Sequence, residues 1–257
     1  MDPVAAFRLD EQVAIVTGAS SGLGKRFAHV LSAAGARVAV AARRDDRLRA
    51  LAGHLQSQGG EVLPVPCDVT DQCQVDSMVA AVRDSFGGVD VLVNAAGIGR
   101  ADAEEIESPR SFRRVLDVNT TGTYICTLAA ARAMLSRDRG AVVNVASISG
   151  LVAGDGFDTP SYTASKGAIV SLTRELGVRW ASRGVRVNAI APGWFQSEMT
   201  AETLASEEGM RFVTERTPLG RPGAEYELDG ALLFLASDAS SYVTGQTVVV
   251  DGGWTAR

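Results

Sequence analysis

Tyr162 and Lys166 lie four residues apart, a spacing that places two side chains on one face of a helix, about one turn from each other. An isolated tyrosine has a pKa of about 10, too high for ready proton exchange at neutral pH. A lysine cation close to the ring favours the phenolate and lowers that pKa, which is what a tyrosine needs to act as a general acid and base. The pair is common by chance, however, so by itself it indicates a surface pair more often than a site.

A second pattern that can do chemistry is the segment 17–24, whose glycines have the spacing G-x-x-x-G-x-G. Gly18 permits a tight turn, Gly22 lets the backbone approach a pyrophosphate, and Gly24 allows a helix to pack closely on a sheet. The free N–H groups at the start of the following helix attract phosphates. With a strand before it and a helix after it, the segment predicts a dinucleotide site; a purely structural turn is the alternative.

The residues after the second apolar run indicate which dinucleotide would bind. Dinucleotide-binding folds often carry an acid here, about 20 residues past the glycines, for the adenosine ribose hydroxyls. This chain has Ala42 at that position, followed by Arg43 and Arg44, with Lys25 as a further positive charge nearby. Because an acid would repel a 2′-phosphate and a guanidinium can bind one bidentately, we expect NADP(H) to be preferred, with NAD(H) possible. The alternative is that the arginines only solvate a strand end.

Short β-branched runs alternate with longer segments of helical length along the chain. The runs are nearly continuous in apolar residues, as is typical of strands buried on both faces of a parallel sheet. We therefore predict an α/β fold, a doubly wound sheet of seven parallel strands with helices on both faces, in one domain over residues 1–257. The predicted strands are 13–17, 37–41, 61–65, 89–93, 141–145, 185–190 and 247–250, and the predicted helices are 23–34, 47–58, 72–86, 112–136, 161–182 and 225–236. Residues 193–218 interrupt the alternation, and we expect them to form a mobile, partly helical flap beside the substrate.

Composition excludes several classes of function. A formal net charge of −5 and the absence of a long basic run argue against a nucleic-acid partner. No apolar run reaches the roughly 18–20 residues of a membrane helix, and the N-terminus lacks the features of a signal peptide. The three cysteines include no C-x-x-C pair, so we expect reduced thiols in a cytoplasmic protein. The two histidines are far apart in the sequence, and no metal site is expected.

Taken together, the ordered motifs resemble those of the short-chain dehydrogenase/reductase family. The match spans residues 9–254 and adds further family motifs to the glycine turn and the Tyr162–Lys166 pair. These motifs are Asn94-Ala95-Ala96-Gly97, Asn119, Ser147, Pro192-Gly193 and Asp251-Gly252-Gly253. Within the family, the chain is most similar to 3-oxoacyl-carrier-protein reductases and to gluconate-type or secondary-alcohol dehydrogenases. The resemblance implies a Rossmann-type fold and a homotetramer formed through the long helices after the fourth and fifth strands.

The resemblance also implies roles for single residues. Tyr162 would exchange a proton with the substrate oxygen, Lys166 would hold the nicotinamide ribose and lower the tyrosine pKa, and Ser147 would hydrogen-bond the substrate oxygen. Asn119 would order a water in a proton relay through Lys166. The implied cofactor contacts are Gly18, Ser20, Ser21, Gly22, Leu23, Gly24, Arg43, Arg44, Asp68, Val69, Asn94, Ala95, Ala96, Gly97, Tyr162, Lys166, Pro192, Gly193 and Ser197. Taken singly, residues of these types also serve as caps, turns or braces between strand ends.

The substrate side is where the sequence departs from the family. Ser147 and Tyr162 are 15 positions apart, more than in many relatives, and the extra residues fall at 154–159. We expect this loop to border the substrate; a solvated insertion is the alternative. Ser197 stands where relatives often have a threonine, and the hydroxyl is kept. The candidates for substrate contact are Ser149, Phe157, Trp194 and Phe195.

The leading hypothesis is an NADP(H)-dependent carbonyl reductase or secondary-alcohol dehydrogenase that acts on a small ketone or alcohol. A 3-oxoacyl-carrier-protein reductase is the alternative with the same chemistry, and a basic patch beside the site would favour its acidic carrier protein. A non-catalytic cofactor-binding or scaffolding protein would be expected to have lost Tyr162 or Lys166, and neither is lost. An epimerase or dehydratase of the family's extended branch is disfavoured by the chain length and the late glycine pattern.

Overall fold

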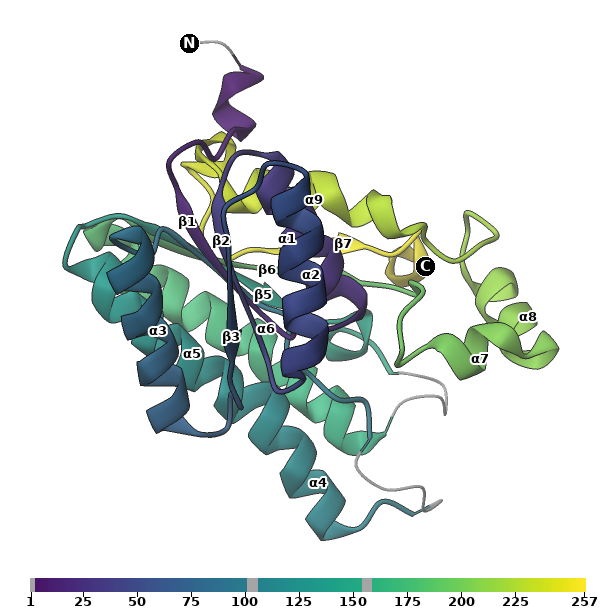
Figure 1. Cartoon of the computed structure of the whole chain (residues 1–257). Coiled ribbons are helices and arrows are strands. Elements are labelled where there is room, and N and C mark those ends of the chain that lie inside the picture. The colour runs from purple at the N-terminus through teal and green to yellow at the C-terminus, as the bar shows by residue number, and fades with distance from the viewer. Residues whose placement is uncertain (1–2, 101–105, 154–158) are drawn as a thin grey trace.

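Seven parallel strands form one sheet in the computed structural model, which describes residues 3–100, 106–153 and 159–257. The strand order is β3-β2-β1-β4-β5-β6-β7, and Figure 1 shows helices packed on both sides of the sheet. The predicted doubly wound α/β fold is therefore confirmed. The strands are β1 (Val13–Thr17), β2 (Arg37–Ala42), β3 (Val62–Pro66), β4 (Val91–Asn94), β5 (Gly140–Val145), β6 (Val185–Pro192) and β7 (Thr247–Val250).

The order of the strands reverses between β1 and β4. The chain builds outward from β1 through β2 to β3, then returns to place β4 on the other side of β1. The register sets Thr17, the last residue of β1, level with Ala41 on β2 and with Asn94 on β4. Connections that leave two adjacent strands toward opposite faces of the sheet open a crevice at the carboxyl ends of those strands. The fold therefore places this crevice beside Thr17.

Successive residues of a strand point to opposite faces of the sheet, and each face has its own core. Ala14 and Val16 of β1 pack in one apolar cluster, with residues of α1, α2 and α9. Val13 and Ile15 pack in a second cluster, with residues of α3, α5 and α6. The helices are α1 (Gly22–Ala33), α2 (Asp45–Ser57), α3 (Gln72–Phe86), α4 (Pro109–Leu116), α5 (Gly122–Leu135), α6 (Pro160–Trp180), α7 (Ala201–Ala205), α8 (Glu207–Arg216) and α9 (Asp229–Ala236). None of these helices is both long and apolar enough to span a bilayer.

Two of the predicted helices are divided in the structure. The one expected over 112–136 consists of α4, a π-helical turn over Asp117–Thr121, and α5. The helix expected over 225–236 begins as a 3₁₀ turn, Glu225–Leu228, before α9. A helical pattern of apolar residues averages over several turns and does not register one widened turn, and π turns of this kind occur mostly at functional sites.

Residues 193–218, called the flap below, contain the short helices α7 and α8, which stand out from the sheet in Figure 1. Aromatic rings hold the flap against the C-terminal end of the chain. The Trp194 ring lies 6.2 Å from the Phe212 ring and 6.2 Å from that of Trp254, and the Phe212 and Trp254 rings lie 5.6 Å apart. The flap is thus helical in part, as predicted, and packs on a residue that the sequence analysis did not select.

Candidate active site

A cleft of about 410 Å³ opens at the carboxyl ends of β1 and β4. It is lined by all of the predicted cofactor residues except Asn94. Asn94 is buried, and its Nδ2 donates to Thr127 Oγ1 and to Asn144 Oδ1, both at 2.9 Å. The Asn94 side chain therefore braces β4 against β5 and α5 and does not line the cleft. Thr17 Oγ1 takes part in holding the loop that follows β4, because it accepts from Ala95 N and Ala96 N.

The floor of the cleft is the glycine turn between β1 and α1, and its shape requires glycine. Gly18 has a φ of +69°, and a Cβ there would lie 2.7 Å from the Ala95 backbone. A Cβ on Gly24 would lie 2.4 Å from Gly18 O. Ser21 occupies the N-cap position of α1 but its side chain makes no capping hydrogen bond. The first N–H groups of α1 consequently face the cleft uncapped by a side chain, as an anion-binding helix start requires.

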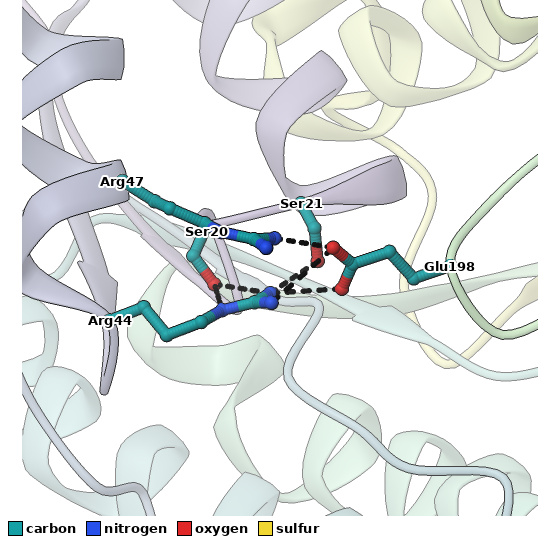
Figure 2. Close-up of polar contacts among 5 residues, drawn as sticks. All are labelled: Ser20, Ser21, Arg44, Arg47 and Glu198. Carbon is teal, nitrogen blue, oxygen red and sulfur yellow. Dashed lines mark hydrogen bonds and ion pairs between the residues drawn. The ribbon is translucent and has the colours of Figure 1, made fainter.

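Two arginines and a flap carboxylate meet at the end of the cleft beside β2 (Figure 2). Arg44 Nη2 donates to Ser20 Oγ at 2.9 Å, to Ser21 Oγ at 2.8 Å and to Glu198 Oε2 at 3.0 Å. Arg47, from α2, forms an ion pair with the same carboxylate. Arg43 is exposed and makes no side-chain hydrogen bond or ion pair with the residues that the structure describes.

Asp68 lies in the same cleft, after β3. Its Oδ1 accepts hydrogen bonds from Thr70 N at 3.0 Å and Thr70 Oγ1 at 2.8 Å. Partial burial acts to raise the pKa of Asp68, but the two Thr70 hydrogen bonds and the positive charges of Arg43 and Arg114 outweigh that effect and lower it. The aspartate is therefore an ionised acceptor that partly balances Arg43.

At the other end of the cleft, Tyr162 and Lys166 come together in the first turns of α6. Thr159 is the N-cap of this helix, with its Oγ1 accepting from Tyr162 N at 3.3 Å, and Pro160 is its first residue. Lys166 Nζ lies 5.5 Å from the centre of the Tyr162 ring and donates to Val145 O at 2.7 Å. Burial of the Lys166 side chain lowers its pKa to about 8. The predicted pair thus faces the cleft, with the ammonium group held below the ring by the end of β5.

Asn119 lies behind this pair, in the π-helical turn. Its Oδ1 accepts from Ile98 N at 2.8 Å, and its Nδ2 donates to Ile98 O at 2.9 Å and to Ser165 Oγ at 3.0 Å. The side chain therefore ties the loop after β4 to α6. A Cβ built on Gly97 would lie 3.3 Å from Asn119 Oδ1 and 3.8 Å from Lys166 Nζ, so the amide and the ammonium group both lie close to this glycine.

A second cavity, of about 620 Å³, joins the first at Ser147, Tyr162 and Gly193, which line both. Ser147 Oγ donates to Ser149 Oγ at 3.0 Å and accepts from Ser149 N at 3.1 Å. The wall of the second cavity includes Ser149, Val152, Thr159, Trp194, Met199 and Trp254. It also includes two acids, Glu107 and Glu198, and one described cation, Arg100. Tyr162 thus lines both the first cleft and a second cavity with a mixed polar and aromatic wall.

The predicted substrate residues fall in different places. Ser149 and Trp194 line the second cavity. Phe195 does not line this cavity. It is buried, lines the first cleft, and packs so closely on Gly223 that a Cβ on Gly223 would lie 2.3 Å from its ring. Phe157 lies outside the described residues.

Two acids at the site were not selected from the sequence. Glu107 accepts from Ser161 N at 3.0 Å, also accepts from Ser161 Oγ, and so holds the start of α6. Glu198 holds Arg44 and Arg47. The Glu107–Ser161 and Glu198–Arg44 partners are 54 and 154 residues apart, and no local pattern in the sequence links them.

A sequence model of the family described as enoyl-(acyl carrier protein) reductase matches residues 18–255. The chain is 42% identical over 257 residues to galactitol 2-dehydrogenase (L-tagatose-forming) of Cereibacter sphaeroides, covering 99% of each chain. It is 38% identical over 247 residues to a 3-oxoacyl-[acyl-carrier-protein] reductase of Synechocystis sp., covering 95% of this chain and 97% of the other. The crystal structure of a gluconate 5-dehydrogenase from Burkholderia cenocepacia J2315, in complex with NADP and tartrate, superimposes with a TM-score of 0.94 at 33% identity, covering 99% of both chains.

Proposed function

The chain belongs to the short-chain dehydrogenase/reductase family and is an oxidoreductase that acts on alcohols and ketones. We propose that it is an NADP(H)-dependent dehydrogenase that oxidises small polyhydroxylated alcohols and reduces the corresponding ketones. The observation that carries the proposal is the position of Tyr162 and Ser147 where the two cavities meet. A cofactor in the first cleft and a small substrate in the second would then share one reacting centre.

The first cleft fits a nicotinamide dinucleotide. A glycine turn that leaves no room for a Cβ at Gly18 or Gly24 lies against the uncapped start of α1, where a pyrophosphate is favoured. Ala42 in place of an acid, with Arg43 and Arg44 beside it, supports NADP(H) over NAD(H) because a guanidinium binds a 2′-phosphate and a carboxylate repels it. The related gluconate 5-dehydrogenase structure contains NADP.

When bound, the nicotinamide supplies or accepts the hydride, and the protein supplies the proton transfer and the positioning. In the direction of reduction, Tyr162 Oη donates a proton to the carbonyl oxygen, which Ser147 Oγ also contacts through a hydrogen bond. In the direction of oxidation, the Tyr162 phenolate accepts the hydroxyl proton, and Ser147 Oγ donates a hydrogen bond to the substrate oxygen. Lys166, whose pKa burial lowers to about 8, contributes positive charge beneath the tyrosine ring and stabilises its phenolate.

Asn119 acts as a positioning residue in this proposal. Its amide links the main chain at Ile98 to Ser165, one residue before Lys166. The loop that borders the cofactor and the helix that carries the proton donor are thereby held at a fixed separation. The water relay implied by the family resemblance would have to pass beside Gly97, because the Asn119 amide and the Lys166 ammonium group both lie close to the space in front of this glycine.

The second cavity supports a small, hydroxyl-rich substrate. Hydroxyl groups of Ser149, Thr159 and Thr203 and the carboxylate of Glu107 can exchange hydrogen bonds with polyol hydroxyls. The rings of Trp194 and Trp254 offer apolar faces to the C–H groups of such a chain. With two acids and one cation in its described wall, the cavity favours a neutral polyol over a strongly anionic carrier protein. The related galactitol 2-dehydrogenase is named for a polyol.

The test is a steady-state assay of the purified chain with NADP⁺ and NAD⁺ against hexitols, tetritols, sugar acids and simple secondary alcohols, with NADPH and an acyl-carrier-protein β-keto thioester as a separate arm. We expect kcat/KM to be highest for a polyol and higher with NADP⁺ than with NAD⁺. Faster turnover of the thioester than of any polyol would identify the carrier-protein reductase instead. Binding of NADPH without turnover of any of these compounds would contradict an enzymatic role on this substrate class.

A further inference from the structure

Glu198 stands at the tip of a short, internally hydrogen-bonded turn of the flap. Thr200 Oγ1 donates to Phe195 O at 2.6 Å and accepts from Ser197 N at 3.0 Å, while Thr200 N donates to Ser197 Oγ at 3.2 Å. The buried Phe195 anchors this turn to the core. The direction of the Glu198 side chain is therefore set by the fold of the turn.

The carboxylate reaches Arg44, the N-cap residue of α2, and Arg47 in the first turns of the same helix. Glu198 Oε1 and Oε2 accept from Arg44 Nη1 at 3.3 Å and Nη2 at 3.0 Å, and Oε1 also accepts from Arg47 Nη1 (Figure 2). A Cβ built on Gly22 would lie 3.4 Å from Ser197 Cβ, so the turn rests against the glycine loop. Glu198 also lines the second cavity. Glu198 thus bridges the phosphate-binding end of the cleft and the wall of the substrate cavity.

Arg44 has little capacity left for another anion in this arrangement. Its Nε and Nη2 donate to Ser20 Oγ, its Nη2 also to Ser21 Oγ, and its two terminal nitrogens to Glu198. A phosphate that binds Arg44 bidentately must therefore replace the carboxylate or bind beside it. Hydrogen bonds from Arg44, Arg47 and Ser21 lower the pKa of Glu198 to about 2, so the side chain carries its charge at every working pH.

We infer that Glu198 is a specificity-determining residue, which competes from the flap with the cofactor's 2′-phosphate for Arg44 and Arg47. The inference rests on the proposed function, which places the adenosine ribose at Arg43 and Arg44. Glu198 lowers the ratio of NADPH affinity to NADH affinity, because it neutralises positive charge that the 2′-phosphate would bind. The affinity for NADH, which has no 2′-phosphate, is unaffected. It also couples the cofactor to the flap, because a 2′-phosphate that takes Arg44 releases the ion pair that holds the turn against the glycine loop.

The first test compares Glu198→Gln with Glu202→Gln, an exposed acid on α7 that serves as a matched control in the same flap. Dissociation constants for NADPH and NADH are measured by fluorescence titration of the purified full chain. For a unit charge about 5 Å from a phosphate dianion in water, Coulomb's law gives an effect of about tenfold on NADPH binding. We expect Glu198→Gln to tighten NADPH by that factor, with NADH changed less than about twofold and both constants unchanged in Glu202→Gln. Unchanged or weaker NADPH binding in Glu198→Gln overturns the inference.

An Arg43→Ala variant in the same titrations separates this inference from the proposed function. If Arg43→Ala weakens NADPH selectively while Glu198→Gln leaves the NADPH to NADH ratio unchanged, the arginine site stands and the competition by Glu198 is wrong. If neither variant alters the ratio, the 2′-phosphate does not bind at the arginines and the NADP(H) assignment itself fails.

The coupling to the flap has its own measurement, hydrogen–deuterium exchange of peptides covering residues 193–218. Adenosine 2′,5′-bisphosphate, which carries the 2′-phosphate but no nicotinamide, should raise exchange in the unmodified chain, whereas adenosine 5′-monophosphate should not. Glu198→Gln should show the raised exchange without any nucleotide. Equal exchange in the two proteins, with the bisphosphate having no effect on either, overturns the coupling.

Discussion

Lys166 is a buried cation whose ammonium group donates to a main-chain carbonyl, Val145 O, at 2.7 Å. Removal from water disfavours its charged form, and burial lowers its pKa to about 8 from an ordinary value of 10.5. Between those two values the unfolded chain binds more protons than the folded chain, so the free energy of unfolding rises with pH across this window. Below it, the folded protein bears the full cost of holding the charge. The charged Lys166 therefore lowers the stability of the fold while it places a cation beneath Tyr162.

This cost can be measured with a Lys166→Met variant of the cofactor-free protein. As the pH rises from about 8 to 10.5, the free energy of unfolding of the unmodified chain should increase relative to that of the variant, by at most about 3 kcal/mol. Urea unfolding of both proteins at a series of pH values gives this difference, and titration of other groups cancels in it. Parallel stability profiles across the window would show that Lys166 has an ordinary pKa in the folded state.

At the scale of elements, the start of α6 determines where Tyr162 lies. Thr159 caps the helix, Pro160 is its first residue, and Glu107, from before α4, accepts hydrogen bonds from Ser161. A carboxylate is favoured at this end of a helix because the first N–H groups carry partial positive charge. Since Tyr162 is in the first turn, its position depends on these three contacts more than on the rest of α6.

We expect Glu107→Gln to lower the free energy of unfolding by about 1 kcal/mol and to lower kcat several-fold while leaving NADPH affinity unchanged, because the first cleft does not include Glu107. The matched control is Glu175→Gln, which changes an exposed acid on α6. Its ion pair with Arg179 is exposed, so the loss should be no more than about 0.5 kcal/mol, with kcat retained. Equal kcat in the two variants would mean that Glu107 does not position the tyrosine.

The elements also show why the sequence predicted some parts of the site and missed others. The strands and the glycine turn depend on neighbours within one turn or one strand, so local spacing was enough to predict them. The Tyr162–Lys166 pair was predicted only from its place among the other ordered motifs. The π-helical turn around Asn119 is a change of one residue in the helical repeat, which periodicity does not resolve. Glu107 and Glu198 act on partners distant in the sequence, and only the folded chain brings them together. Asn94 has the residue type expected by the family motif but is used within the sheet.

On the surface of the molecule, the long helices α5 and α6 carry exposed apolar side chains. Val178 on α6 is 77% exposed and Tyr124 on α5 is 42% exposed, and exposed apolar surface favours association. We propose that these helices form the interface of a homotetramer. Light scattering should give four times the mass of the chain, and Val178→Glu should reduce it, because a buried unpaired charge is costly. A monomer for the unmodified chain would contradict the proposal.

In the proposed function, Tyr162 lies at the junction of two cavities and transfers the proton in an NADP(H)-dependent reaction. The most direct test is kcat for Tyr162→Phe on the best alcohol substrate, measured beside the NADPH dissociation constant of the same preparation. Loss of a positioned general acid and base typically costs 10²- to 10⁴-fold, so we predict that kcat falls by at least about 100-fold while NADPH affinity stays within about threefold. Retention of more than about a tenth of the original kcat would contradict the claim.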